Sequence, residues 1–198
     1  MNILKELQKP LAAHEIEFRV QSVSPYGKAT ILAYKDARAD MERLDAAVGV
    51  LGWKREHVNS NKNCIVSIYD KESEQWVSKE DTGTESNMEK EKGLASDSFK
   101  RACFNWGIGR ELYDYPTIQI ELKGDGKGNP DNKWTDEWIA KSPKTQKPTT
   151  LWGLRLKEWI WFNQFDEDGN LNYLAAKDYE NKLRFQWGKY IKEQEKAA

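Results

Sequence analysis

The feature that most constrains this fold is an amphipathic pattern over residues 87–106. Apolar side chains recur there at three- and four-residue spacing, which is the period of one helix face, at Met88, Ala95, Phe99, Ala102, Cys103 and Trp106. Gly107-Ile108-Gly109 follows directly and is a strong helix stop. The sequence therefore predicts one long helix in the middle of the chain, with a buried face.

Strand patterns stand on both sides of this helix. Residues 15–23 alternate apolar and polar side chains, and residues 29–34 are apolar and β-branched, so we expect the two segments to form a hairpin. Residues 156–165 and 171–176 flank an Asp-Gly turn and predict a second hairpin near the C-terminus. Three more strands are expected at 53–58, 63–69 and 75–79.

Two shorter helices and one long loop complete the expected organisation. Residues 2–9 and 36–48 have helical patterns, and Gly49 or Gly52 is expected to end the second helix. Residues 123–150 are rich in Gly, Lys, Pro, Asp and Thr, which is typical of a long basic loop. This loop separates a core at 1–122 from a hairpin and helix at 151–198, which we expect to pack on the same single domain.

Composition bounds the class of protein. The chain has 198 residues, a formal net charge of −1 and 38% hydrophobic residues. Its mean hydropathy is −0.86. The longest apolar stretch, residues 46–51, is far too short to cross a bilayer, and charged residues interrupt the N-terminal segment, so it is no signal peptide. We expect a cytoplasmic protein with no membrane partner.

No catalytic motif is visible. Cys64 and Cys103 are expected to be buried free thiols, and His14 and His57 lack the spacing of metal ligands. Residues 124–128 lack the spacing and the ending of a phosphate-binding P-loop. Several acidic residues could compose a metal-dependent nuclease site, although nothing in their spacing favours such a site over a solvated loop. They are Asp70, Glu72, Glu74, Glu80 and Asp81. We expect no enzymatic site, no metal and no cofactor.

A basic stripe lies opposite the apolar face of the long helix. Lys90, Lys100 and Arg101 fall within about 100° of one another on a helical projection. Asp97 and Phe104 interrupt the stripe. A solvated face with local ion pairs explains such a stripe as well as a binding surface does. Asp97 is four residues from Arg101 and three from Lys100, and it either orients these cations or forms an ordinary surface ion pair.

Two ordered sequence blocks resemble the Rad-fifty-two family of single-strand annealing proteins, in particular its compact bacteriophage members. The first block is Glu-Asp-Thr-Gly-Thr-Glu at residues 80–85, then Ser-Asp-Ser-Phe-Lys-Arg-Ala at 96–102 and Trp-Gly at 106–107. The second block contains Tyr34 and Arg38, followed by Arg-Leu-Asp at 43–45 and Gly-Trp at 52–53. The resemblance covers about residues 10–120 well and about 150–188 loosely.

The resemblance implies an α+β fold: a β-β-β-α core with an antiparallel sheet packed on a long helix, plus a C-terminal β-hairpin. It also implies a ring- or helix-forming homo-oligomer, in which edge strands of neighbouring subunits pair and a continuous groove holds one DNA strand. A protein that grips the sugar-phosphate backbone leaves the bases free to pair. Base pairing itself drives annealing, so no nucleotide hydrolysis is needed.

The resemblance also suggests which side chains contact DNA. Lys100 and Arg101 match the basic pair on the groove floor, and Arg38 matches an arginine at the start of the second helix. Phe104 stands where some members carry a further basic residue, and Asp97 is a supporting residue. The expected DNA-binding side chains are Lys100, Arg101, Arg38, Lys90, Lys92, Arg43, Arg19 and Lys28.

The function that the resemblance implies is ATP-independent annealing of single-stranded DNA in homologous recombination and repair, with residues 1–122 as the annealing core. Two alternatives stay open: a protective single-stranded DNA-binding module without annealing activity, and a metal-dependent nuclease. Because the net charge is −1, a DNA-binding chain must segregate its cations into a stripe. The implied partners are single-stranded DNA, its complementary strand and further copies of the chain. A single-strand-binding protein or an exonuclease is a candidate partner, in a bacterial host cytoplasm if the chain is phage-encoded.

Overall fold

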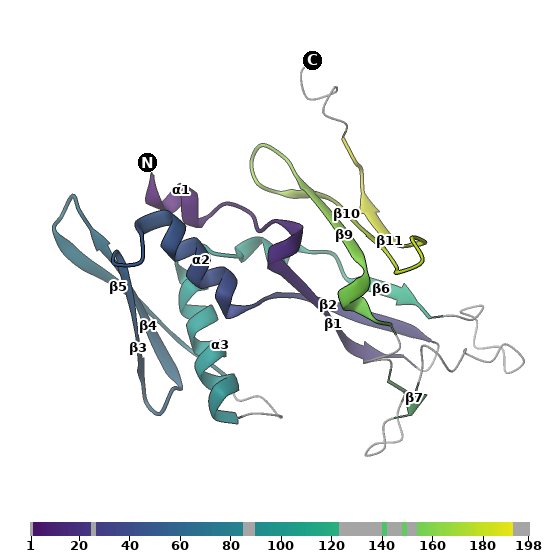
Figure 1. Cartoon of the computed structure of the whole chain (residues 1–198), viewed down its shortest axis with the longest axis horizontal. Helices are drawn as coiled ribbons and strands as arrows, with labels where there is room; N and C mark the ends of the chain where they lie inside the picture. The colour runs from purple at the N-terminus through teal and green to yellow at the C-terminus, as the bar shows by residue number, and fades with distance from the viewer. Residues whose placement is uncertain are drawn as a thin grey trace, which may run out of the picture. The chain divides into compact units, whose positions relative to one another are not determined.

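The computed structural model describes residues 2–24, 27–84, 90–122, 140–141, 148–149 and 154–191, with backbone alone at 90–92, 140–141 and 148–149. It contains helices and antiparallel sheets, so the expected α+β class is confirmed (Figure 1). The chain divides into two compact units. Unit 1 comprises Met1–Leu11 and Lys35–Arg110, and unit 2 comprises Ala12–Tyr34 and Glu111–Ala198.

Unit 1 is a three-stranded antiparallel sheet packed on helices. Its sheet order is β3-β4-β5, and the strand sequence leads directly into the long helix α3, so the expected β-β-β-α arrangement is confirmed. Its elements are α1 (Ile3–Leu7), α2 (Ala37–Val48), β3 (Trp53–Val58), β4 (Asn63–Asp70), β5 (Gln75–Thr82) and α3 (Lys90–Asn105).

The ends of the two longer helices follow the sequence signals. The Asp36 side chain accepts a hydrogen bond from the backbone N–H of Arg38 and caps the start of α2. Gly49, with φ of 77°, ends α2, as one of the two expected glycines. Helix α3 ends before Gly107, which has φ of 103°, so the predicted stop is confirmed.

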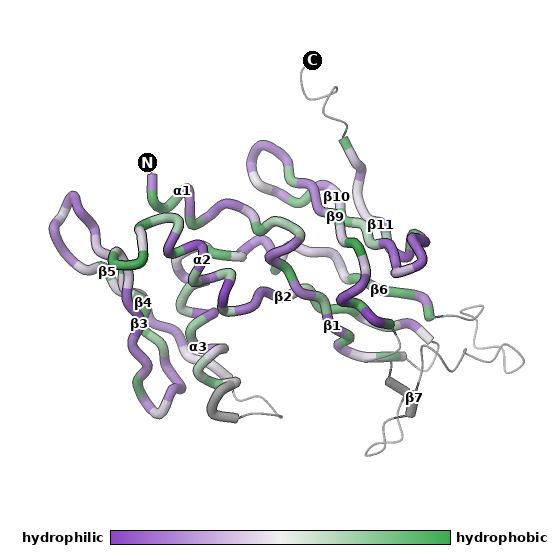
Figure 2. The backbone as a smooth tube through the Cα atoms, viewed as in Figure 1, coloured by the Kyte–Doolittle hydropathy of each residue, from purple (hydrophilic) through white to green (hydrophobic). Residues whose placement is uncertain are grey.

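The core of unit 1 joins α3 to the central strand β4. Phe99, Ala102 and Cys103 on α3 are buried, as the amphipathic pattern predicted. Cys64 and Val66 on β4 are also fully buried in this core, and both cysteines are free thiols, as expected. Burial raises the pKa of the Cys103 thiol well above its usual value. Figure 2 shows that the hydrophilic segments of this unit include the β4–β5 turn, away from the core.

Unit 2 is built from two antiparallel three-stranded sheets, ordered β1-β2-β6 and β11-β10-β9. Side chains from both sheets, including Ile31, Ile120, Leu174 and Ala176, are buried in one hydrophobic core. The elements in the two sheets are β1 (Ile16–Val23), β2 (Lys28–Lys35), β6 (Ile118–Glu121), β9 (Ile160–Phe165), β10 (Leu171–Lys177) and β11 (Leu183–Gly188). Both expected hairpins, β1–β2 and β9–β10, are present.

Short elements complete the described chain. They are the 3-10 turns η1 (Ala13–Glu15), η2 (Arg110–Asp114) and η3 (Leu156–Glu158) and the strand pair β7 (Ala140–Lys141) and β8 (Pro148–Thr149). Most of the expected loop at 123–150 lies outside the described residues. No helix in the described part of the chain is long and apolar enough to cross a membrane.

Unit 2 differs from expectation at three places. Residues 156–158 form the turn η3 rather than the start of a strand, because β9 begins only at Ile160. The strand β6 was not foreseen, although Ile118 and Ile120 alternate with polar residues. Strand β11 occupies Leu183–Gly188, in the C-terminal segment where a helix was expected, and residues 192–198 lie outside the described part. That both units pack as a single domain stays a prediction.

Candidate functional site

The two central residues of the basic stripe lie on α3, away from its buried face. Arg101 is exposed, with 47% of its side chain accessible, and Lys100 is half-buried. The adjacent Phe99 and Ala102 are fully buried and fix the rotation of the helix. The helical projection of the sequence therefore gave the correct orientation for this part of α3.

Strand β5 supplies the carboxylate that lies beside Arg101. The Arg101 Nε atom is 3.5 Å from Asp81 Oδ1. The Asn105 amide donates hydrogen bonds to Asp81 Oδ2 at 3.2 Å and to the Glu80 carbonyl at 3.1 Å. Lys79, on the same face of the strand, donates to the Asn105 carbonyl at 2.7 Å. These polar contacts hold the last turns of α3 against β5.

The end of β5 approaches the backbone of α3 closely at Gly83. A Cβ atom at this position would lie 2.6 Å from the Ser98 backbone nitrogen and 2.8 Å from the Leu94 carbonyl oxygen. Neither backbone atom could move without shifting the helix, so glycine is required here. Thr84 follows, and its backbone N–H and hydroxyl donate to Asp97 Oδ2 at 2.8 and 3.1 Å.

Asp97 therefore holds the end of β5 on the helix. Its hydrogen bonds go to Thr84, whereas the carboxylate beside Arg101 is Asp81. The buried Ser98 hydroxyl makes a further connection, because it donates to the Asn61 carbonyl in the β3–β4 turn at 3.1 Å. The Gly-Thr and Asp-Ser pairs of the first sequence block thus fix the frame that carries Lys100 and Arg101.

The Arg-Leu-Asp and Gly-Trp parts of the second sequence block lie at the end of α2 and the start of β3. Leu44 is fully buried, and Asp45 accepts a hydrogen bond from the Trp53 indole at 2.7 Å. A Cβ at Gly52 would lie 2.2 Å from the Val48 carbonyl oxygen. Arg43, an expected DNA-binding residue, donates to the carbonyl oxygens of Lys9 and Pro10 at 2.9 and 3.0 Å. Its guanidinium therefore anchors the segment after α1.

A buried ion pair connects α2 with the segment that follows α3. Lys35 pairs with Asp40 and donates to the Ile108 carbonyl at 2.8 Å. Burial raises the pKa of Asp40 to about 6, against the lowering effect of the Lys35 charge and the smaller one of Lys100.

Arg38 lies in the first turn of α2 and is the most exposed of the expected cations whose accessibility the structure gives. Its side chain is 82% accessible, and its Nε is 3.9 Å from Asp36 Oδ1. Such an exposed pair adds little stability, so the guanidinium stays available to a ligand. Unit 1 thus carries Arg38 on α2, and Lys100 and Arg101 on α3.

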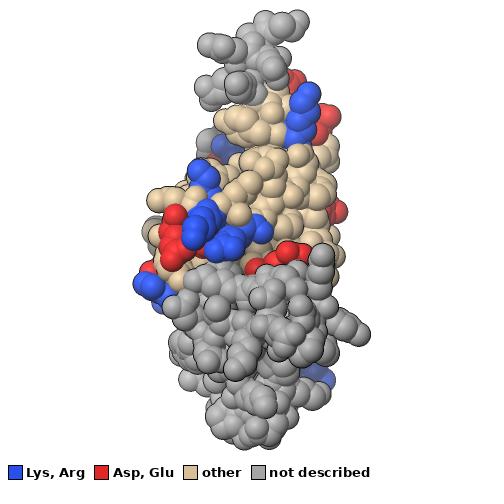
Figure 3. Space-filling model, turned by 90° about the vertical axis from the view of Figure 1, so that its right-hand side faces the viewer, with Lys and Arg blue, Asp and Glu red and all other residues tan. Residues whose placement is uncertain are grey.

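The remaining expected residues are distributed differently. Arg19 and Lys28 belong to unit 2, where Arg19 lies 5.1 Å above the Tyr34 ring and Lys28 is 3.6 Å from Glu121. The Phe104 ring, in unit 1, is covered by Arg110 at 5.6 Å. The side chains of Lys90 and Lys92 lie outside the described residues. On the face drawn in Figure 3, basic and acidic side chains lie beside one another.

Sequence reasoning missed the polar clamp between β5 and α3. Asp81 was considered as a metal ligand and as part of the first sequence block, but not as a partner of Arg101, and no role was given to Lys79 or Asn105. The period-2 pattern contains a signal, since Lys79 and Asp81 fall on one face of a strand. Among the described residues, no group of three or more His, Cys, Asp or Glu side chains is arranged to hold a metal ion.

Two known proteins are similar to this chain in sequence. The chain is 34% identical over 118 residues to the single-stranded DNA-binding protein DdrA of Deinococcus radiodurans, and 33% identical to the DdrA protein of Deinococcus deserti. The match covers 58% of this chain and 56% and 58% of the relatives, so the chain spans just over half of their length. No family model and no solved structure matches.

Proposed function

We propose that this chain binds single-stranded DNA through the surface formed by Arg38, Lys100 and Arg101, hereafter the basic surface. The observation behind the proposal is the position of Lys100 and Arg101 on α3, where buried neighbours fix the rotation of the helix and the contacts of Asp81 hold it against β5. The similarity to proteins named single-stranded DNA-binding supports the choice of ligand.

The chemistry of these side chains suits the DNA backbone. Arginine forms two parallel hydrogen bonds with a phosphate, and lysine adds a point charge. Neither contact depends on base identity, so binding is independent of sequence. The net charge of −1 gives no general attraction to DNA, and binding therefore relies on this local group of cations.

Within this function we propose annealing as the specific activity. A strand that is held by its phosphates keeps its bases free to pair with a complementary strand, and pairing needs no nucleotide hydrolysis. The resemblance of the sequence blocks to the Rad-fifty-two family supports this finer proposal. The activity would serve recombination and repair in the cytoplasm.

Oligomerisation is part of the proposal, because one copy offers few phosphate contacts. Three cations on one subunit give weak binding at physiological salt, whereas several copies on one strand multiply the contacts. We propose a ring or a helical array of copies with the basic surface of each subunit along the strand. An exonuclease or a single-strand-binding protein would deliver that strand.

The test is an annealing assay with two complementary labelled oligonucleotides. The variant Lys100→Ala/Arg101→Ala should lose annealing, while its oligomeric state and melting temperature stay those of the wild type. The charge-matched control is Lys5→Ala/Lys71→Ala, which removes two exposed cations elsewhere on unit 1. If the first variant anneals as fast as the control, the basic surface is not the DNA site.

The same preparation separates the alternatives. Strong DNA binding without faster pairing of complementary strands would identify a protective binding module. Cleavage of the labelled strands in magnesium or manganese would identify a nuclease, and its loss in an Asp81→Asn variant would place the nuclease site at β5.

A further inference from the structure

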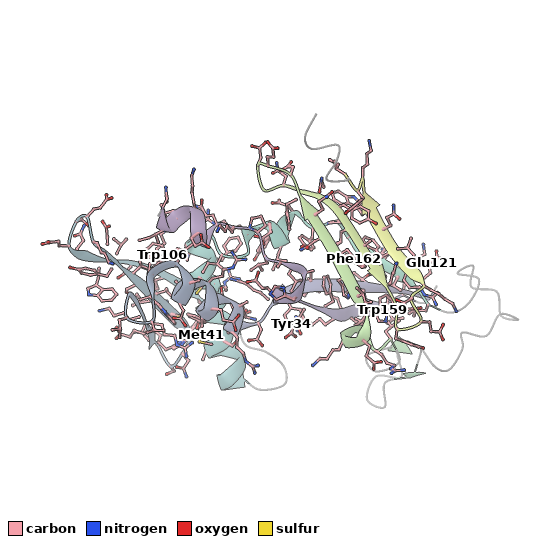
Figure 4. All side chains as sticks on the ribbon, turned by 45° about the horizontal axis from the view of Figure 1, so that its top comes forward. Tyr34, Met41, Trp106, Glu121, Trp159 and Phe162 are labelled. Atoms are coloured by element: carbon pink, nitrogen blue, oxygen red, sulfur yellow. The ribbon has the colours of Figure 1, made fainter. Side chains whose placement is uncertain are left out.

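Unit 2 contains an open hollow of about 600 Å³ between η1 and β1 on one side and η3 and β9 on the other. Strands β1 and β9 each lie at the end of the strand order in their sheet. The side chains that line it include His14, Glu17, Phe18, Lys157, Trp159 and Trp161. Figure 4 labels Trp159 at the start of β9. The residues of the basic surface, Arg38, Lys100 and Arg101, are not among those that line this hollow.

The inner part of the hollow is a set of parallel aromatic rings. Phe18 and Trp161 are stacked with ring centroids 3.5 Å apart and an interplanar angle of 4°. The ring centroids of Trp159 and Trp161 are 6.3 Å apart, with an interplanar angle of 22°. The Trp159 indole N–H donates a hydrogen bond to the Leu154 carbonyl, which fixes the orientation of the Trp159 ring. Flat rings held in parallel are the surface on which a planar ring system stacks, and every nucleobase has such a face.

The Trp161 indole N–H is buried and has no hydrogen-bond partner among the residues that the structure describes. Buried donors in native structures are nearly always paired, so an orphan donor at a hollow marks a place where a partner is missing. Ring nitrogens and carbonyl oxygens of nucleobases are acceptors of the required type. The unpaired N–H is an observation independent of the ring stacking, and it is compatible with a planar ligand that carries acceptors.

The charges around the hollow favour an anionic ligand. Glu17 accepts a hydrogen bond from the Tyr34 hydroxyl at 2.5 Å, and Glu158 is paired with Arg155. Lys157 and His14 are exposed, and no hydrogen bond or ion pair of their side chains occurs within the described structure. The carboxylates are thus satisfied locally while the donors remain available for a phosphate.

We propose that this hollow, hereafter the base site, binds one nucleotide, with its base on the Phe18–Trp161–Trp159 stack and its phosphate toward Lys157 and His14. The proposal deepens the proposed function, on which it rests for the source of the nucleotide, a base of the bound strand. Its chemistry differs from that of the basic surface, because the basic surface holds phosphates alone.

The test uses 2-aminopurine deoxyribonucleoside 5′-monophosphate, whose fluorescence falls when the base stacks on aromatic rings. Titration into the full chain should give saturable quenching. Phe18→Leu should weaken binding about tenfold, since stacking on an aromatic ring is lost. Lys157→Gln should weaken binding of the monophosphate about threefold and leave binding of the corresponding nucleoside unchanged.

Lys189→Gln is the matched control, because Lys189 is an exposed lysine of unit 2 that does not line the hollow. It should bind the monophosphate like the wild type. Circular dichroism shows whether Phe18→Leu is folded, and Lys157→Gln tests the site without touching the core. Absence of saturable quenching, or equal effects of Lys157→Gln and Lys189→Gln, would overturn the base site.

The two proposals fail in different experiments. The mononucleotide titration tests the base site whether or not long DNA binds. Conversely, if oligonucleotide binding requires Lys100 and Arg101 while the mononucleotide does not bind, the basic surface stands and the base site is rejected.

Discussion

The two units of this chain solve the problem of a stable core differently. Unit 1 buries one sheet face against α3 and then adds polar clamps, in which Asp81 and Asp97 connect strand ends with the helix. Unit 2 packs sheet on sheet and fills the contact with aromatic rings such as Phe18 and Trp161. The two units therefore offer different groups to a ligand. Unit 1 offers exposed cationic side chains, and unit 2 offers aromatic rings that line an open hollow.

The units also differ in how the chain builds them. Most of unit 1 is one continuous stretch, Lys35–Arg110, whereas unit 2 joins Ala12–Tyr34 to a segment that begins almost eighty residues later, at Glu111. Contacts close in sequence form with less loss of chain entropy than distant ones. Unit 1 is therefore expected to fold first and to keep its structure when unit 2 is damaged.

The largest effect should come from a cavity placed in one core at a time. Leu44→Ala in unit 1 and Leu174→Ala in unit 2 each empty a fully buried position, and each should lower the stability of its own unit by about 2–5 kcal/mol. Hydrogen exchange read residue by residue shows which unit loses protection. Equal loss in both units, from either variant, would mean that the units unfold together as a single domain.

A smaller effect is expected where β5 meets α3. Gly83→Ala places a methyl group against the backbone of Ser98 and Leu94, and should destabilise unit 1 by about 1–3 kcal/mol. Glu56→Ala is the control, because Glu56 is an exposed residue on β3 of the same unit. Thermal melts compare the two. A fully stable Gly83→Ala protein would show that the strand end is not tightly bound to the helix.

The buried Asp40 gives the stability of unit 1 a dependence on pH. Its pKa is about 6 in the folded protein, above the ordinary value of 3.8, chiefly because burial disfavours the carboxylate. The folded state therefore holds the proton more tightly. The resulting stability is fully present below the unfolded pKa and is lost as the pH rises through about 6. Lys35 and Lys100 oppose the shift.

Denaturant unfolding at several pH values between the two pKa values measures this contribution. Asp40→Asn should flatten the pH dependence of unit 1 in that window and leave unit 2 unchanged. The Asn side chain keeps an acceptor for Lys35, so the variant is expected to fold. An unaltered pH profile in Asp40→Asn would assign the dependence to another group.

The smallest effect concerns Arg38. Arg38→Ala removes an 82% exposed side chain whose ion pair with Asp36 is also exposed, so stability should change by less than about 0.5 kcal/mol. Affinity for single-stranded DNA should fall about two- to threefold, and equally for all sequences, because a phosphate contact carries no sequence information. Fluorescence anisotropy with oligonucleotides of different composition checks both points. A loss confined to one base composition would contradict a backbone contact.

The sequence predicted the parts of the molecule that depend on local periodicity. The rotation of α3 follows from the spacing of Phe99, Ala102 and Cys103, and the β-β-β-α order follows from alternation and turns. The joining of Ala12–Tyr34 with the C-terminal sheet was not predictable, because it depends on which distant apolar faces match. The clamp of Asp81 on Arg101 and Asn105 was missed for the same reason: it needs the register between a strand and a helix.

The central claim is that cations on α3 hold the phosphates of a single strand, and the salt dependence of affinity tests it most directly. For wild-type protein, the logarithm of affinity should fall linearly with the logarithm of salt concentration. Lys100→Ala/Arg101→Ala should reduce that slope by about 1.4 per bound subunit, since each phosphate contact contributes about 0.7 on single strands. Identical slopes for the two proteins would contradict the account.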